Sequence, residues 1–69
     1  MENRLQELRT EQRWTQVELA EKLGVTRQTV ISIERGRFDP SLPLAFEIAA
    51  LFQLRIEDVF RHDRTRTRR

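Results

Sequence analysis

The chain contains no cysteine and no tyrosine, only two glycines and a single histidine. Without cysteine it forms neither a disulfide scaffold nor a thiolate metal site, and the absence fits a reducing compartment such as the cytoplasm. His62 lies among arginines near the C-terminal end, a poor position for a metal ligand or a general base. Glycine-rich phosphate loops, paired catalytic carboxylates and metal-ligand spacings are missing too. The sequence therefore predicts no enzyme activity, no cofactor and no small-molecule ligand.

Long apolar runs are also missing. The longest, residues 48–52, is far too short to span a bilayer, and the first ten residues are charged, unlike a signal peptide. At 69 residues the chain has room for one domain, near the lower limit at which a hydrophobic core alone suffices. We expect a soluble, cytoplasmic protein with no membrane contact.

Charge is unevenly distributed along the chain. Residues 61–69 hold five arginines and one aspartate, so this end carries +4 while residues 1–60 carry −2 of the net charge of +2. Almost nothing apolar follows Phe60, which predicts a disordered basic tail at 61–69 behind a folded domain at 1–60. A nucleic-acid-binding surface on the domain must then be a local patch.

A short helix begins at Thr15. Thr15 and Glu18 have the spacing of a capping box, in which each side chain bonds the other residue's backbone N–H. Gly24 ends the helix, because a residue without Cβ readily adopts the left-handed conformation past a helix end. Between them, apolar residues at helical spacing predict a buried face made of Val17, Leu19, Ala20 and Leu23.

A second short helix follows the glycine turn, at about residues 26–35. Thr26 is suited to cap it, and Gly36 ends it. At 100° per residue, Val30 and Ile33 face inward. The outward face is polar or mixed and consists of Gln28, Ile31, Ser32 and Arg35, with Arg27 on the flank.

Three further helices complete the domain. A helix at residues 3–13 offers Leu5 and Leu8 to the core, and Trp14 is placed to anchor it to the next helix. Ser41 suits the N-cap of a fourth helix, in which Pro43 is tolerated in the first turn. Leu42 and Phe46 lie off the main apolar face of that helix, so either the first and last helices or a second subunit must cover them.

Residues 15–36 resemble the helix-turn-helix of the Cro and phage-repressor type, the xenobiotic-response-element (XRE) family. The stretch 36–46 resembles the link to the fourth helix in compact members, and 56–60 resembles their short closing helix, so the resemblance covers about residues 3–60. It implies an all-α fold, a compact five-helix bundle of the lambda-repressor-like DNA-binding type. It further implies a transcriptional regulator that binds double-stranded DNA at an operator, by default a repressor, with activation left open.

In such a protein the helix at 26–35 enters the major groove. Gln28 can pair bidentately with adenine, and Arg27 can serve either guanine or a phosphate. Ile31 either packs on a thymine methyl group or is an ordinary surface residue, and Ser32 either bonds a base or faces water. The remaining expected DNA contacts, mainly to phosphates, are Gln16, Thr26, Arg35, Arg37 and Ser41.

Two expectations concern structure and partners. The resemblance assigns Arg9 and Glu34 to an ion pair between the first and third helices, a structural role. A homodimer is expected, because one short helix reads only a few base pairs and pairing doubles the site. The alternative function is a protein-interaction module on the same scaffold, such as an antitoxin that holds its toxin, favoured slightly by Ile31 and the net-negative domain.

Overall fold

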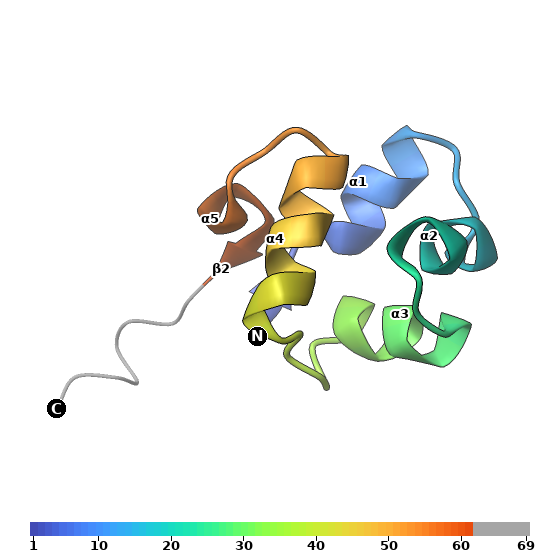
Figure 1. Ribbon diagram of the computed structural model, residues 1–69, viewed down its shortest axis with the longest axis horizontal. Helices are drawn as coiled ribbons and strands as arrows, with labels where there is room; N and C mark the ends of the chain where they lie inside the picture. Colours follow the sequence, from blue (N-terminus) through green and yellow to red (C-terminus); the bar gives the residue numbers. More distant parts are fainter. Residues whose placement is uncertain (62–69) are drawn as a thin grey trace, which may run out of the picture.

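The computed structural model describes residues 1–61 and contains, within them, five helices and two short strands. In chain order these are β1 (Glu2–Asn3), α1 (Leu5–Glu11), α2 (Gln16–Leu23), α3 (Arg27–Glu34), α4 (Leu42–Leu51), α5 (Ile56–Val59) and β2 (Phe60–Arg61). Figure 1 shows α2 above α3 on one side, α4 in the centre, and α5 with β2 on the other side. The predicted all-α bundle with a helix-turn-helix at α2 and α3 is confirmed.

The helix ends that the sequence assigned to Thr15, Gly24, Thr26 and Ser41 are found at those residues. The Thr15 hydroxyl accepts a bond from the Glu18 N–H at 3.0 Å, and the Glu18 carboxylate accepts one from the Thr15 N–H at 2.8 Å, which completes the capping box. Thr26 and Ser41 cap α3 and α4 in the same way through their hydroxyl groups. Gly24 has a φ of 71°, the left-handed conformation that ends α2.

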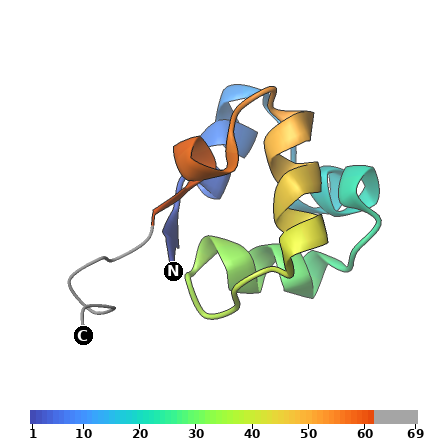
Figure 2. The ribbon, with the colours of Figure 1, turned by 60° about the vertical axis from the view of Figure 1, so that its left-hand side comes forward.

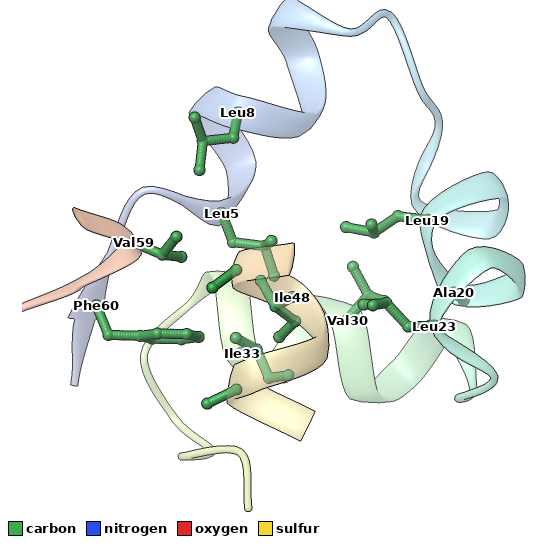
Figure 3. Packing of buried hydrophobic residues seen from close by; sticks show 12 residues of the cluster. Leu5, Leu8, Leu19, Ala20, Leu23, Val30, Ile33, Ile48, Val59 and Phe60 are labelled. Carbon is green, nitrogen blue, oxygen red and sulfur yellow. The ribbon is translucent and has the colours of Figure 1, made fainter. Parts of the chain in front are cut away.

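The core is a single apolar cluster to which every helix contributes (Figure 3). Its members are buried side chains, namely Leu5, Leu8, Leu19, Ala20, Leu23, Val30, Ile33, Ala45, Ile48, Ala49, Val59 and Phe60. Trp14 packs at the edge of this cluster as predicted, with its ring 5.6 Å from that of Phe52 and the Lys22 ammonium 4.7 Å above it. Trp14 therefore joins the α1–α2 corner to the end of α4.

Val17 is not part of the core, although the sequence placed it on the buried face of α2. Its side chain is 48% exposed. On a helix with 100° per residue, Leu19, Leu23 and Ala20 together span an arc of about 100°, and Val17 lies about 60° beyond Ala20. The three-residue spacing from Val17 to Ala20 correctly predicts a helix, but the buried arc of that helix is narrower than the sequence predicted.

The two strands were not predicted. β1 and β2 pair in antiparallel fashion, with Glu2 opposite Arg61 and Asn3 opposite Phe60. The first helix is consequently shorter than the predicted 3–13, because Asn3 lies in β1 and its side-chain oxygen accepts a bond from the Leu5 N–H. The closing helix likewise ends at Val59, before Phe60. Both ends of the described chain therefore lie side by side (Figure 2).

The apolar residues outside the main face of α4 are not covered by α1 or α5. Leu42 is 64% exposed and Phe46 is 58% exposed. Of the two coverings considered from the sequence, the one by the first and last helices is not found within residues 1–61. No helix within residues 1–61 is long and apolar enough to cross a membrane.

Candidate nucleic-acid interface

The turn between α2 and α3 holds the two helices in a fixed relation. The Val25 N–H bonds the Ala20 carbonyl at 3.0 Å, and the Gly24 N–H bonds the Glu21 carbonyl at 3.3 Å. These two bonds satisfy two of the last four carbonyls of α2, those of Ala20 and Glu21. Val25 then packs against the core, and Thr26 begins α3. The outward face of α3 thus follows a short turn that is closed by two backbone hydrogen bonds.

The outward face of α3 has an exposed rim and a half-buried middle. Arg27, Gln28 and Arg35 are exposed, whereas Val30 and Ile33 on the opposite side are completely buried. Ile31 and Ser32 are half-buried and lie outside the core cluster. The structure therefore brings together on one helix the side chains that the sequence assigned to the outward face.

The arginines of the described residues fall into two groups. Arg4, Arg9, Arg55 and Arg61 each lie within 4.0 Å of a carboxylate oxygen. Those with no such partner within residues 1–61 are Arg13, Arg27, Arg35 and Arg37. Three of these four lie on α3 or directly after it. The net-negative domain consequently presents three positive charges without a carboxylate partner within residues 1–61 on or directly after α3, where an anionic partner would be attracted.

A buried carboxylate joins three helices behind this face. Glu34 of α3, with a side chain only 3% exposed, accepts bonds from Arg9 Nε at 2.6 Å and Arg9 Nη2 at 3.4 Å. Gln16 Nε2, at the start of α2, donates to the same carboxylate at 3.1 Å. Arg9 also donates to the Trp14 carbonyl at 2.8 Å. The Arg9–Glu34 pair expected from the resemblance is confirmed, and the bond from Gln16 extends it to α2.

The remaining predicted contacts lie at helix starts and in the loop after α3. Gln16 is half-buried and uses one N–H for Glu34, which leaves the second N–H for a ligand. Thr26 and Ser41 are exposed, and their hydroxyls cap α3 and α4, so backbone N–H groups there are the available donors for an anion. Arg37 is exposed and directly follows Gly36, whose φ is 73°.

Sequence reasoning missed Asn3, which fixes the C-terminal end of α3. Its side-chain N–H donates to the Ile33 carbonyl at 2.8 Å, and its side-chain oxygen accepts the N–H of Leu5, the first residue of α1, at 3.0 Å. The amino group of Met1 lies beside the same end of α3, 3.3 Å from the Gly36 carbonyl oxygen and 3.2 Å from an Asp39 carboxylate oxygen. No local sequence pattern predicts these contacts, because they depend on where the start of the chain packs. Within residues 1–61 no three potential ligands (His, Cys, Asp or Glu) are grouped to hold a metal ion.

Comparison with known proteins gives a consistent result. A family model described as helix-turn-helix matches residues 5–59. The chain is 55% identical over 60 residues to a protein named as an uncharacterised HTH-type transcriptional regulator of Methanocaldococcus jannaschii, covering 87% of this chain and 91% of that protein. It is 34% identical over 56 residues to the immunity repressor protein of Bacillus phage phi105, covering 81% of this chain and 39% of the repressor. A crystal structure of a hypothetical transcription factor from Neisseria superposes with a TM-score of 0.70 at 28% identity, covering 78% of this chain and 61% of that one.

Proposed function

Because the chain belongs to the helix-turn-helix family of DNA-binding transcriptional regulators, we propose that it recognises a specific operator by placing α3 in the major groove. The observation that carries this proposal is the group of arginines around the outward face of α3 that have no carboxylate partner in the described part of the chain. Behind that face, Glu34 fixes α3 to α1 and α2, so the helix is presented as a rigid element. The major groove of B-DNA, about 12 Å wide, admits an α-helix. Since the proposed protein acts on DNA, the location proposed for it is the cytoplasm.

Along α3 the roles divide by position. Gln28 lies in the first turn, the part of a recognition helix that meets base edges, and its amide can pair with adenine N6 and N7. Arg27 beside it serves guanine or a phosphate. Ile31 and Ser32, in the half-buried middle, supply apolar and hydroxyl contacts to bases. Phosphate contacts hold the register of the helix on the duplex and come from Gln16, Arg35, Arg37 and the amides at Thr26 and Ser41.

The mode of regulation proposed is repression by occupation of the operator. The similarity to a phage immunity repressor supports this mode. A short protein of this kind needs no separate catalytic or effector site to repress, because a bound domain on the operator already excludes other proteins from the same DNA.

The proposed assembly is a homodimer whose subunits meet through α4 and α5. Leu42 and Phe46 are one helical turn apart and thus share a face, and both are largely exposed. Next to them, between α4 and α5, lies an apolar groove of about 500 Å³ that includes Phe46 and Ile56. Its rim carries the opposite charges of Arg55 and Glu57. A two-fold axis at this groove would let each Phe46 enter the partner's groove and each arginine meet the partner's carboxylate.

Base readout is tested by comparing two substitutions on one operator. The operator is first selected from a randomised duplex pool and then titrated, with its single-base variants and a random duplex, at several salt concentrations. Gln28→Ala should cost about 1–3 kcal/mol on the selected site and relax the preference at one position per half-site. Arg37→Ala should weaken selected and random duplexes alike and reduce the salt slope by about one unit. If Gln28→Ala loses affinity equally for every duplex, or loses none, α3 does not read bases through this face.

The dimer is tested by sedimentation of Phe46→Glu against a matched change at Val17, which is also exposed and apolar but lies on α2. Phe46→Glu should be a folded monomer with weaker operator binding, because a carboxylate cannot enter the apolar groove. Val17→Glu should remain dimeric. A monomeric unmodified protein at tens of micromolar would instead assign the exposed residues of α4 to a different protein partner, as in an antitoxin.

A further inference from the structure

The side chain of Gln16 connects the interior of the domain to its surface. Its Nε2 donates to the Glu34 Oε1 at 3.1 Å, and the side chain of Glu34 is only 3% exposed. Gln16 is half-buried, and the oxygen of its amide, for which no hydrogen bond is found within residues 1–61, is not itself buried. The amide group therefore reaches from a buried carboxylate to the solvent at the first residue of α2.

Glu34 also determines the orientation of the Gln16 amide. A carboxylate only accepts hydrogen bonds, whereas a glutamine amide has an N–H end and a C=O end of nearly the same shape. The N–H end must face Glu34, because a carbonyl oxygen in that place would be repelled by the carboxylate. One N–H of the amide nitrogen makes this bond, which leaves the second N–H as a donor for a ligand. Glu34 thus fixes both the place and the direction of a donor at the start of α2.

Arg9 keeps the buried carboxylate from repelling an anion at Gln16. Its guanidinium donates to Glu34 through Nε at 2.6 Å and through Nη2 at 3.4 Å, so the pair together carries no net charge. Its Nη1 donates to the Trp14 carbonyl at 2.8 Å, which holds the guanidinium against the turn between α1 and α2. The bonds form one chain from Trp14 to Gln16, and hydrogen bonds in such a chain strengthen one another by polarisation. An anion that approaches Gln16 therefore meets a polarised donor with a neutral pair behind it.

From this arrangement we propose that Glu34 is a positioning residue for DNA binding, which holds the free N–H of Gln16 toward one phosphate of the operator without contacting DNA itself. The proposal rests on the proposed function of α3 and adds a second role for the buried carboxylate, beside its role in stability. A long side chain that becomes ordered only on binding weakens a complex by about two- to tenfold. Glu34 orders the Gln16 side chain before DNA arrives, so this loss does not arise.

The first test measures the order of the Gln16 side chain in the protein without DNA. Gln28, the other glutamine proposed to contact DNA, is exposed in the first turn of α3 and serves as the control within the same chain. Nitrogen relaxation of the side-chain amides should give Gln16 an order parameter near the value of about 0.85 that is typical of rigid backbone, and Gln28 one below about 0.6. A Gln16 amide as mobile as that of Gln28 would overturn the proposal without any substitution in the protein.

The second test identifies the phosphate that Gln16 binds. Single phosphates of the selected operator are replaced in turn by uncharged methylphosphonates, and Gln16→Met keeps the length of the side chain while it removes the hydrogen bonds. One replacement should weaken binding of the unmodified protein by about tenfold, since it removes a hydrogen bond to a charged group, and should weaken Gln16→Met far less. The control is the phosphate bound by Arg37, identified in the same way with Arg37→Ala, whose replacement should affect Gln16→Met and the unmodified protein equally. The predicted basic tail at 61–69, which apart from Arg61 lies outside the described residues, is kept unchanged in every protein compared.

The third test removes the positioning contact without changing the net charge, by replacing Arg9 and Glu34 together with methionine. In this double variant the Gln16 amide should become mobile, operator affinity should fall about two- to tenfold, and the methylphosphonate at the Gln16 phosphate should lose most of its effect. The methylphosphonate at the Arg37 phosphate should keep its effect, which separates lost positioning from a general loss of structure. Glu34→Asp keeps the charge but withdraws the carboxylate from Gln16 by one methylene group, so it should give the same pattern and replaces the double variant if that variant does not fold.

The outcomes separate the two proposals. An unmodified protein that selects no sequence from the randomised pool contradicts the proposed function of α3. A protein that selects an operator, but for which no phosphate distinguishes Gln16→Met from the unmodified chain, contradicts only the positioning role. The same conclusion follows if the Gln16 phosphate keeps its full effect in the variants at Glu34, because the buried carboxylate is then structural alone.

Discussion

Glu34 should be the most sensitive polar residue of the domain. Its carboxylate is 3% exposed and receives bonds from α1 and α2, so Glu34→Ala leaves the Arg9 guanidinium, itself 13% exposed, without a counter-charge. Removing one partner of a buried pair typically costs about 3–5 kcal/mol. A domain of this length is stabilised by about 3–10 kcal/mol in total, at roughly 0.05–0.15 kcal/mol per residue. Glu34→Ala should therefore remove about 30% or more of the stability, and at the lower end of total stability it should unfold the domain.

Substitution of the other partner, Arg9, tests the same reasoning. Arg9→Met strands the Glu34 carboxylate and should also cost about 3–5 kcal/mol. Replacing both residues by methionine removes both charges together, and buried pairs exchanged for apolar side chains of similar volume are often close to neutral. The double variant should thus be folded and more stable than either single variant.

The measurement is urea unfolding followed by circular dichroism. Glu34→Met strands Arg9 as Glu34→Ala does, and it completes a double-mutant cycle with Arg9→Met, the double methionine variant and the unmodified protein. Even if a single variant is unfolded without urea, recovery of helix in the double variant remains a clear result. The reasoning is refuted if each single substitution costs under about 1 kcal/mol, or if the double variant is as damaged as the worse single one.

Three further stability predictions concern the backbone and the edge of the core. Gln53 follows the end of α4 with a φ of 59°, a conformation in which an L-residue is strained by about 1–2 kcal/mol. Gln53→Gly should relieve this strain and stabilise the domain by about 0.5–1 kcal/mol, after the greater entropy of glycine in the unfolded chain is subtracted. A lowered melting temperature would contradict this. Thr15→Ala removes the hydroxyl of the capping box and should cost about 1 kcal/mol in urea unfolding, whereas no change would mean that water replaces the cap. Val17→Ser should change stability by less than about 0.5 kcal/mol while Leu19→Ala costs about 2–5 kcal/mol, and similar costs for the two would show that Val17 is buried after all.

The sequence predicted those features whose cause is local. Thr15 and Glu18 determine a helix start because the two residues bond each other, and Gly24 determines a helix end because of its own conformational freedom. The inward residues Val30 and Ile33 followed from helical periodicity alone. In each case the information lies within one helix or one turn.

Features that depend on the meeting of distant segments could not be predicted in this way. Two-residue strands have no detectable periodicity, so the pairing of Asn3 with Phe60 leaves no trace in the sequence. The bond from Gln16 to Glu34 requires knowing how α2 is turned relative to α3. Val17 shows the same limit. Periodicity predicts on which side of the helix a residue lies, but it does not predict how wide the surface packed against that side is. The expected DNA contacts on α3 stay predictions until the substitutions at Gln28 and Arg37 are measured.

The packing of Trp14 gives the protein a built-in optical probe. It is the only tryptophan, and the chain has no tyrosine, so near-ultraviolet excitation produces emission from this one side chain. The indole lies against Phe52 and under the Lys22 ammonium, where α1, α2 and α4 meet. Its emission therefore reports whether these three helices are docked, without any label. A spectral shift on adding DNA would mean that α4, which carries the proposed dimer surface, has moved against the corner between α1 and α2.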